Sequence, residues 1–321
     1  MKRQWAVVLL NLGGPDSLQS VKPFLYNLFS DREIIPLGPR PLQRPLAWLI
    51  STLRAPKTKK AYELIGGCSP ILKITEKQAT LLKEALQREG IVAEVFVGMR
   101  YWHPFIEETV KRIKESGFES VLGLSLYPQY SLATTGSSQR AFRRACSRYQ
   151  LQCRFVSQWY DHPLYIKALA GTIRKVLKDL PLKGTCLLFS AHGLPVSFIE
   201  KGDPYKDQIE KTVELVKKEL EKEGLLPELV KLSYQSRTGP MKWLEPYTDD
   251  AIRKCAFMDF KNIVIVPVSF VSDHIETLYE IDILYKGLAD ECGINLFRTP
   301  ALNTEPTFIE ALKDIVINHI G

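Results

Sequence analysis

Eight short apolar runs, rich in β-branched residues, alternate with amphipathic helical patterns along the chain. The runs are AVVLLNL, EVFVGM, SVLGLSLY, CRFVSQW, CLLFSA, VKLSYQS, NIVIVPVSF and INLFRTP. Helical periodicity separates them, for example over residues 75–88, 106–116 and 207–223. Strands that alternate with helices predict parallel α/β layers and disfavour an antiparallel sandwich.

The eight runs divide into two sets of four whose members correspond in kind and order. The first and fifth runs both end in a glycine-containing turn, NLGGP and AHGLP, and the third and seventh both lead into polar segments. For the last three pairs the offset is about 140 residues, which is typical of an internal duplication. A chain of 321 residues also favours two domains over one. We therefore expect two similar α/β domains, at residues 1–160 and 161–304, and a C-terminal helix at 305–321 that packs back on the first domain.

The composition is that of a globular protein with a mild basic excess. Hydrophobic residues make up 45% of the chain, charged residues make up 25%, and the formal net charge is +7. That excess suits an anionic substrate or a membrane surface, but the basic residues form no recognisable nucleic-acid-binding motif, so we expect no nucleic-acid partner. No apolar run reaches the roughly 18 residues of a membrane-spanning helix. The six cysteines include no C-x-x-C pair and are typical of reduced cytosolic thiols.

His192 directly follows the apolar run CLLFSA and therefore lies at the C-terminal tip of a predicted buried strand. In open parallel sheets ligands bind beyond the carboxyl ends of the strands, and the ends of two such domains can face a shared cleft. The segment VSDHIETLYEID follows the seventh run and belongs to the same edge. Its Asp273, Glu276 and Glu280 have helical spacings, which predict three carboxylates on one helix face.

Each of these residues also has an ordinary structural interpretation. Asp273 and Glu276 fit an N-cap residue with its reciprocal partner, Glu280 fits a solvated helix charge, and His192 fits a loop histidine that donates to a backbone carbonyl. Convergence on one cleft favours the functional interpretation instead. An imidazole beside a cluster of carboxylates suits proton abstraction and the binding of a borderline divalent ion.

A second candidate region, LAWLISTLRAPKTKKAYELIGGCSP, passes from an apolar segment to a cationic one that includes Arg54 and Lys57. Apolar surface beside cations suits a flat hydrophobic ligand with carboxylate arms, or the face of an anionic membrane. The alternative is an ordinary amphipathic helix with a solvated basic end. By contrast, NLGGP matches neither the G-x-G-x-x-G nor the Walker pattern, so nucleotide binding is not indicated.

Seven motifs resemble those of the ferrochelatases, in that family's order, from residue 6 to the C-terminal helix. They are NLGGP, IGGCSP, MRYWHP, YPQYSLATTGSS, LLFSAHGLP, KGDPY and FVSDHIETLYEID. The resemblance implies a lyase that inserts ferrous iron into a porphyrin during haem synthesis. It also implies two similar Rossmann-like domains without nucleotide, each a doubly wound four-stranded parallel sheet, with the active-site cleft between them.

The resemblance implies roles for individual residues as well. His192 corresponds to the family's active-site histidine and Glu276 to its partnered carboxylate, and Glu280 and Asp273 extend the acidic line. We expect His192 to act as base, iron ligand or both, with Glu276 and Asp273 as further iron ligands. The implied porphyrin contacts are Leu12, Arg100, Tyr101, Tyr127, Trp243 and Phe270 in the cleft and, near the propionates, Arg54, Lys57, Tyr62 and Ser69.

Two departures from the animal ferrochelatases bear on cofactors. Those members hold an iron–sulfur cluster through one cysteine in the YPQYS segment and others in a C-terminal tail, whereas here Leu132 follows YPQYS and the chain closes with INHIG. Without that tail or an evident transit peptide, the chain resembles the bacterial type. We therefore expect no cofactor, porphyrin and ferrous iron as partners, and a cytoplasmic protein with peripheral membrane contact.

The motifs leave more than one porphyrin as the candidate substrate. SDHIETLYE resembles the members that use protoporphyrin IX, which is our expectation, and coproporphyrin III is the alternative. A cobalt chelatase acting on a more polar tetrapyrrole is a further alternative. A non-catalytic protein that carries haem is the alternative from a different functional class.

Overall fold

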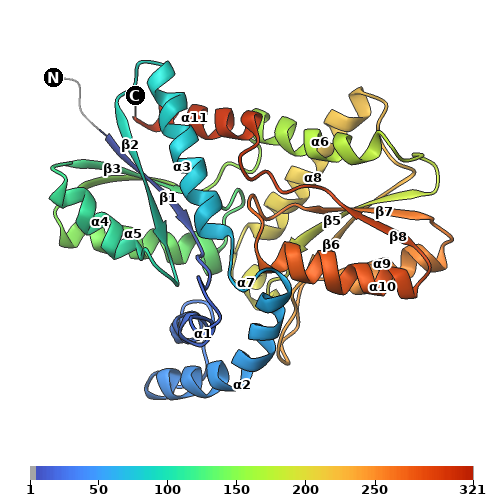
Figure 1. The fold of residues 1–321 in the computed structure, drawn as a ribbon, viewed down its shortest axis with the longest axis horizontal. Helices are drawn as coiled ribbons and strands as arrows, with labels where there is room; N and C mark the ends of the chain where they lie inside the picture. Colours follow the sequence, from blue (N-terminus) through green and yellow to red (C-terminus); the bar gives the residue numbers. More distant parts are fainter. Residues whose placement is uncertain (1–4, 321) are drawn as a thin grey trace. The chain divides into compact units, whose positions relative to one another are not determined.

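The computed structural model describes residues 5–320 and divides into two compact units. Of the described residues, the first unit comprises 5–158 and 312–320, and the second comprises Trp159–Ala311. Residues 1–4, at the start of the predicted first domain, and residue 321, at the end of the predicted C-terminal helix, lie outside the described part. Figure 1 shows the elements of both units.

The first unit contains a four-stranded parallel sheet in the order β2-β1-β3-β4. Its strands are β1 (Trp5–Asn11), β2 (Ala93–Met99), β3 (Ser120–Ser125) and β4 (Gln152–Val156). Its helices are α1 (Val21–Ser30), the 3₁₀-helix η1 (Arg40–Leu42), α2 (Gln43–Leu64), α3 (Ile71–Arg88), α4 (Ile106–Glu115), the π-helix η2 (Leu132–Gly136) and α5 (Ser137–Arg148).

Strand β1 is buried along its whole length because helices cover both faces of the sheet. Alternate side chains of β1 point to opposite faces. Those of Ala6, Val8 and Leu10 join one core cluster with apolar residues of α4 and α5. On the other face, the Asn11 amide lies 3.4 Å from the hydroxyl of Thr75 in α3. The sheet is therefore wound on both sides, as predicted.

The second unit contains the corresponding sheet in the order β6-β5-β7-β8, again all parallel. Its strands are β5 (Thr185–His192), β6 (Leu229–Gln235), β7 (Asn262–Pro267) and β8 (Asn295–Arg298). Its helices are α6 (Pro163–Leu177), α7 (Val196–Glu200), α8 (Tyr205–Lys222), α9 (Thr248–Phe257), the π-helix η3 (Glu276–Tyr285) and α10 (Lys286–Glu291); α11 (Pro306–Ile320) begins in this unit and ends in the first.

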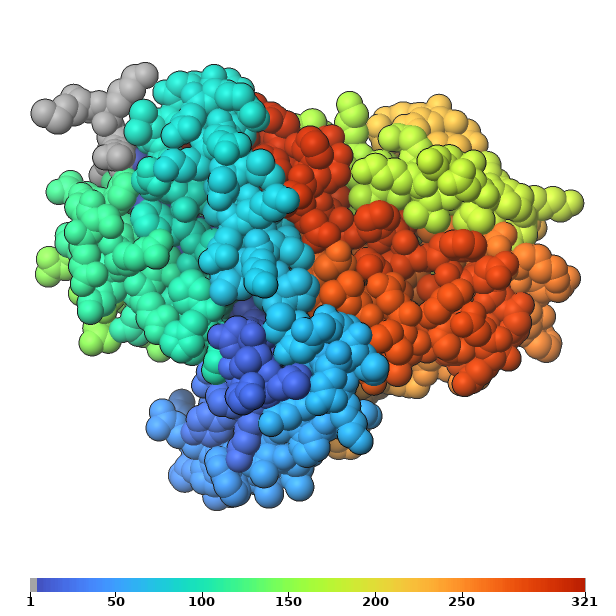
Figure 2. All heavy atoms as spheres, in the orientation of Figure 1, coloured from blue at the N-terminus to red at the C-terminus, as the bar shows by residue number. Residues whose placement is uncertain are grey.

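The two strand orders are equivalent, which confirms the prediction of two similar doubly wound sheets built from two sets of four strands. The offset between β1 and β5 exceeds that of the other pairs because α1 and α2 are inserted between β1 and α3. The inserted pair lies on the surface in Figure 2, at the blue end of the colour scale. None of the helices within residues 5–320 combines the length and apolar character needed to cross a membrane.

Candidate active site

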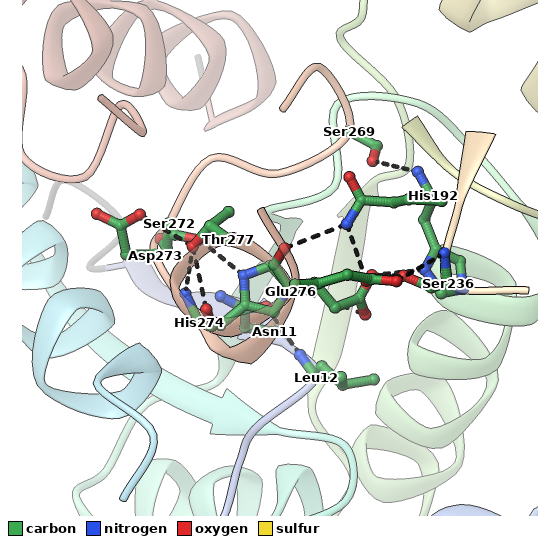
Figure 3. Close-up of polar contacts among 12 residues, drawn as sticks. Asn11, Leu12, His192, Ser236, Ser269, Ser272, Asp273, His274, Glu276 and Thr277 are labelled. Atoms are coloured by element: carbon green, nitrogen blue, oxygen red, sulfur yellow. Dashed lines mark hydrogen bonds and ion pairs between the residues drawn. The ribbon is translucent and has the colours of Figure 1, made fainter. Parts of the chain in front are cut away.

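Three neighbouring strands of the second unit bring the predicted catalytic residues together. His192 is the last residue of β5, Ser236 directly follows β6, and Ser269 lies two residues beyond β7. Because β5 lies between β6 and β7 and all three are parallel, their carboxyl ends meet at one edge of the sheet. Glu276, the first residue of η3, completes the group that Figure 3 shows.

The backbone N–H, the backbone carbonyl and one ring nitrogen of His192 all form hydrogen bonds. Its N–H donates to the hydroxyl of Ser269 at 2.9 Å, and its carbonyl accepts from the Tyr205 hydroxyl at 2.9 Å. Its Nδ1 lies 2.7 Å from a carboxylate oxygen of Glu276. The next residue is Gly193, where a Cβ would come within 2.8 Å of the Gln235 carbonyl oxygen, so the turn after β5 requires glycine.

His192 and Glu276 each favour the charged form of the other. Burial by itself would lower the pKa of His192, but the nearby carboxylate of Glu276 and the more distant one of Glu280 outweigh it and raise that pKa above its ordinary value. Burial would raise the pKa of Glu276, and the imidazole of His192 outweighs it and lowers that pKa. An imidazole bonded through Nδ1 to a carboxylate is oriented and made more basic, which suits a proton acceptor or a metal ligand.

Glu280 contacts the same Ser236 hydroxyl as Glu276, but its pKa is shifted in the opposite direction. Burial and the negative charge of Glu276 raise the pKa of Glu280. Its carboxylate accepts from the side chain of Gln235 at 3.0 Å and from the backbone N–H of Ser236 at 3.1 Å. The sequence-based expectation that Glu276 and Glu280 lie together is therefore met by the geometry, and their catalytic roles stay predictions.

Ser236 is a component of the site that the sequence reasoning missed. Its hydroxyl contacts Glu276 at 2.7 Å and also contacts Glu280, so one side chain ties the two carboxylates together. Its backbone has φ of +67°, a conformation that non-glycine residues rarely adopt. Strained backbone of this kind is characteristic of functional sites. The available signal was its position at the C-terminal end of the predicted strand VKLSYQS.

Replacing Ser236 with alanine is expected to lower, by about tenfold, the activity that the sequence motifs imply, because a hydrogen bond to a charged group is worth about 1.5–3 kcal/mol. The matched variant Ser236→Gly also lacks the hydroxyl but adopts positive φ freely. It should lose the same activity while melting at a higher temperature than Ser236→Ala. Steady-state kinetics and thermal unfolding of both variants test this, and wild-type turnover in either would contradict the role given to the hydroxyl.

The segment after β7 differs from the expectation of one helical face with three carboxylates. Residues Glu276–Tyr285 form a π-helix, and Asp273 precedes it. The carboxylate of Asp273 accepts hydrogen bonds from Thr277, Asn303 and Arg298 at 3.0, 2.7 and 2.9 Å. The carboxylate of Asp273 is thus directed to Arg298 and Asn303, whereas those of Glu276 and Glu280 are directed to Ser236, so the prediction of three carboxylates on one helix face is wrong.

The same geometry decides the capping alternative for Glu276. The backbone N–H of Asp273 donates to the side chain of Asn303 at 2.9 Å, and that of His274 donates to Thr277 at 3.0 Å. The carboxylate of Glu276 is directed to His192 and Ser236 instead, as Figure 3 shows. Glu276 therefore does not serve as the reciprocal partner of an N-cap.

The remaining predicted residues of the second unit surround the histidine. Phe270 lies edge-on to the His192 ring at a centroid distance of 6.2 Å and to His274 at 4.4 Å. Trp243 is buried, and its ring would lie 3.4 Å from a Cβ at Gly193. Both residues are thus neighbours of the turn that presents His192.

In the first unit, several predicted porphyrin contacts gather beyond the ends of β1 and β2. The backbone N–H of Tyr101 donates to the carbonyl of Leu12 at 2.9 Å, which joins the two turns. Ser69 is bonded through its N–H to the Pro15 carbonyl at 2.8 Å. Arg100 forms an ion pair with Asp31 at 2.6 Å.

The other four predicted contacts of that unit lie on α2 or after β3. Tyr62 is buried, Tyr127 is half-buried, and Arg54 and Lys57 are exposed on α2. The guanidinium of Arg54 lies 5.5 Å from the ring centre of Phe29. All porphyrin-binding assignments stay predictions. Within residues 5–320 no group of three or more His, Cys, Asp or Glu side chains is arranged to hold a metal ion.

Solved structures of the sirohydrochlorin chelatase SirB and of CbiX share this fold. SirB from Bacillus subtilis with Fe3+ aligns with a TM-score of 0.57 at 12% identity, covering 98% of this chain and 95% of that one. CbiX, described as the terminal enzyme for biosynthesis of sirohaem in denitrifying bacteria, aligns with a TM-score of 0.52 at 11% identity, covering 98% and 99% of the two chains. At such low identity the likeness shows the fold alone, which is the two-domain α/β fold of SirB and CbiX.

Sequence comparison identifies the family. The model of the Ferrochelatase family matches residues 4–320. The ferrochelatase of Gloeobacter violaceus is 49% identical over 98% of this chain and 97% of its own length. That of Synechocystis sp. is 48% identical over 98% of this chain and 82% of its own. The chain belongs to the ferrochelatase family, as the sequence motifs predicted.

Proposed function

We propose that the protein inserts Fe2+ into protoporphyrin IX and thereby forms protohaem in haem biosynthesis. The observation that carries the proposal is the contact of 2.7 Å between His192 and Glu276 at the tip of β5, in a chain of the ferrochelatase family. The nearby Glu280 and Ser236 supply a polar path away from the imidazole. In this proposal, iron insertion uses His192 as the base together with the carboxylates of Glu276 and Glu280.

Metallation of a porphyrin removes two pyrrole protons while the iron loses its bound water. His192 in its neutral form accepts a pyrrole proton or binds the arriving iron, since a neutral imidazole can do either. Glu276 orients the ring, stabilises the charge that a proton brings to it, and with Glu280 passes protons or iron onward. Asp273 is proposed as an iron ligand together with His192 and Glu276. In this structure its carboxylate forms an ion pair with Arg298.

The porphyrin is proposed to contact apolar and aromatic side chains with its face and cations with its propionates. Leu12, Phe270 and Trp243 supply the apolar contacts, and Arg54 and Lys57 the cations, with further contacts from Tyr62, Ser69, Arg100, Tyr101 and Tyr127. No iron–sulfur cluster is part of the proposal, because Leu132 follows YPQYS. Initial rates with protoporphyrin IX and coproporphyrin III, measured side by side, test the substrate. Faster turnover of coproporphyrin III would contradict protoporphyrin IX.

Replacing both Arg54 and Lys57 with glutamine is expected to raise the KM for porphyrin by about 3- to 10-fold, because two exposed charge contacts are lost. The KM for iron should change less, since only the porphyrin carries anionic arms. The double variant Lys59→Gln, Lys60→Gln removes the same charge from the same helix and serves as the control. Equal porphyrin KM values in the two double variants would contradict a propionate role.

Cytoplasmic location with peripheral membrane contact is a further part of the proposal. Helix α2 exposes Trp48 by 56%, Leu49 by 46% and Leu53 by 71%, beside the cations of the same helix. An apolar surface flanked by cations binds anionic membranes reversibly and in a salt-sensitive way. Sedimentation with anionic vesicles at low and high salt tests this, and salt-independent binding would contradict the electrostatic part.

A further inference from the structure

A cavity of about 700 Å³ is lined only by residues of the first unit. Two of its lining residues, Arg100 and Tyr101, are proposed porphyrin contacts, and the rest of the lining has no ligand assigned above. Its walls come from α1, the start of α2, the loop after β2, the start of α4 and one face of α5. These elements carry labels in Figure 1. The volume is in the range of small-molecule sites in proteins, about 300–1,000 Å³.

The lining of this cavity is strongly basic. Three carboxylates line it, those of Asp31, Glu33 and Glu107. Six arginines oppose them: Arg32, Arg44, Arg100, Arg140, Arg144 and Arg148. The last three are four residues apart along α5, a spacing that places them on one face of the helix. The sequence segment QRAFRRACSR thus lines a cavity rather than forming a uniformly solvated helix face.

One of the arginines is fixed by a hydrogen-bonded cluster at Asp31. Arg100 contacts the Asp31 carboxylate at 2.6 Å, and the hydroxyls of Tyr101 and Ser137 donate to it at 2.8 and 2.9 Å. The Asp31 side chain is only 7% exposed. This cluster uses the charge of Arg100 and gives the cavity a rigid wall.

Arg32 donates to the Gly38 carbonyl and the Gln43 side chain, and the other four arginines remain available to a ligand. Arg140 pairs with Glu33 at 2.7 Å and Arg148 pairs with Glu107 at 2.5 Å, but all four side chains are well exposed, and exposed pairs are weak. A stronger anion can therefore displace either glutamate. Arg44 and Arg144 form no ion pair with another residue in the described part of the chain. The guanidinium group binds phosphate through two parallel hydrogen bonds, which a lysine cannot do.

We infer that this cavity binds a small anion of the oligophosphate class through Arg44, Arg140, Arg144 and Arg148. A ligand with several negative charges matches the excess of positive charge, whereas a single phosphate group uses only part of it. The site is independent of the proposed catalytic residues His192, Glu276 and Glu280. It also does not require the porphyrin, so its test needs no turnover.

The test is calorimetric titration of the full-length protein with inorganic tripolyphosphate at constant ionic strength. We expect saturable binding with one ligand per chain, and binding at least about tenfold weaker in Arg144→Glu, because a charge-assisted contact becomes a repulsive one. The matched control is Arg143→Glu. Arg143 is the neighbouring exposed arginine of α5, it does not line the cavity, and its replacement changes the net charge equally.

Three results would overturn the inference. The first is the absence of saturable binding to the wild-type protein. The second is equal weakening in the Arg143 and Arg144 variants, which would show general surface attraction. The third is displacement of tripolyphosphate by protoporphyrin IX, which would make the cavity part of the porphyrin site.

Discussion

Replacing His192 with alanine is expected to lower kcat/KM for iron insertion by about 100- to 10 000-fold, the usual contribution of a positioned general base. The protein should stay folded. The two hydrogen bonds that hold this position, to Ser269 and from Tyr205, involve backbone atoms of His192 that alanine keeps. Anaerobic kinetics with Fe2+ and thermal unfolding measure the two effects separately.

The structure supplies a matched control for this variant. His103 also lies beside a carboxylate, that of Glu108 at 3.0 Å, but its side chain is 57% exposed and lies in the first unit. His103→Ala removes the same kind of pair and should leave turnover within about threefold of wild type. Near-normal turnover of His192→Ala would remove His192 from the mechanism, and loss of its fold would support the structural interpretation instead.

Replacing Glu276 with glutamine is expected to lower kcat/KM about 10- to 100-fold, as is typical when the partner of a functional histidine is lost. Glutamine keeps the shape and the hydrogen-bonding capacity but not the charge, so the melting temperature should fall by only a few degrees. Glu108→Gln, at the exposed pair with His103, is the matched control. Equal, small effects on turnover and melting in both variants would contradict the catalytic role.

Glu276→Gln should also change the pH dependence of kcat/KM, in a direction that follows from the raised pKa of His192. His192 must be neutral to accept a proton or bind iron, so activity rises as pH passes its raised pKa. In Glu276→Gln the carboxylate that raises this pKa is gone, so the acidic limb of the kcat/KM profile should move to lower pH. An acidic limb that stays in place would show that another group controls it.

Stability should change with pH in the corresponding window. The raised pKa of His192 means that the ion pair stabilises the fold below the ordinary histidine pKa and loses this effect as pH rises through the raised value. The lowered pKa of Glu276 means that its contribution is present above the ordinary glutamate pKa and is lost as pH falls through the lowered value. Glu276→Gln should flatten both changes in thermal unfolding.

The fold was predictable because its signals are local. Apolar runs such as NIVIVP, which forms β7, are long enough to be buried strands, and the helical periodicity between the runs disfavours an antiparallel sandwich. The correspondence of the two halves was visible from the turns after β1 and β5. The insertion of α1 and α2 could be located only once the strands had been paired.

Only those site residues could be predicted that have a reactive side chain and also follow a predicted strand. His192 and Glu276 stood out because an imidazole and a carboxylate each follow a predicted strand. Ser236 did not, because a serine after a strand has many ordinary functions and its positive φ leaves no trace in the sequence. The π-helix was missed because α- and π-helices use the same residues, and the network at Asp273 was missed because Arg298 and Asn303 come from β8 and the loop beyond it.

The most direct test of the proposed function is whether the purified protein converts free-base protoporphyrin IX to protohaem under anaerobic conditions when Fe2+ is added. Loss of porphyrin fluorescence and growth of the haem absorbance report the two sides of the reaction. We predict many turnovers per protein molecule, dependent on Fe2+ and nearly abolished in His192→Ala. Tight binding of porphyrin or haem without turnover, or turnover that is unchanged in His192→Ala, would contradict the account.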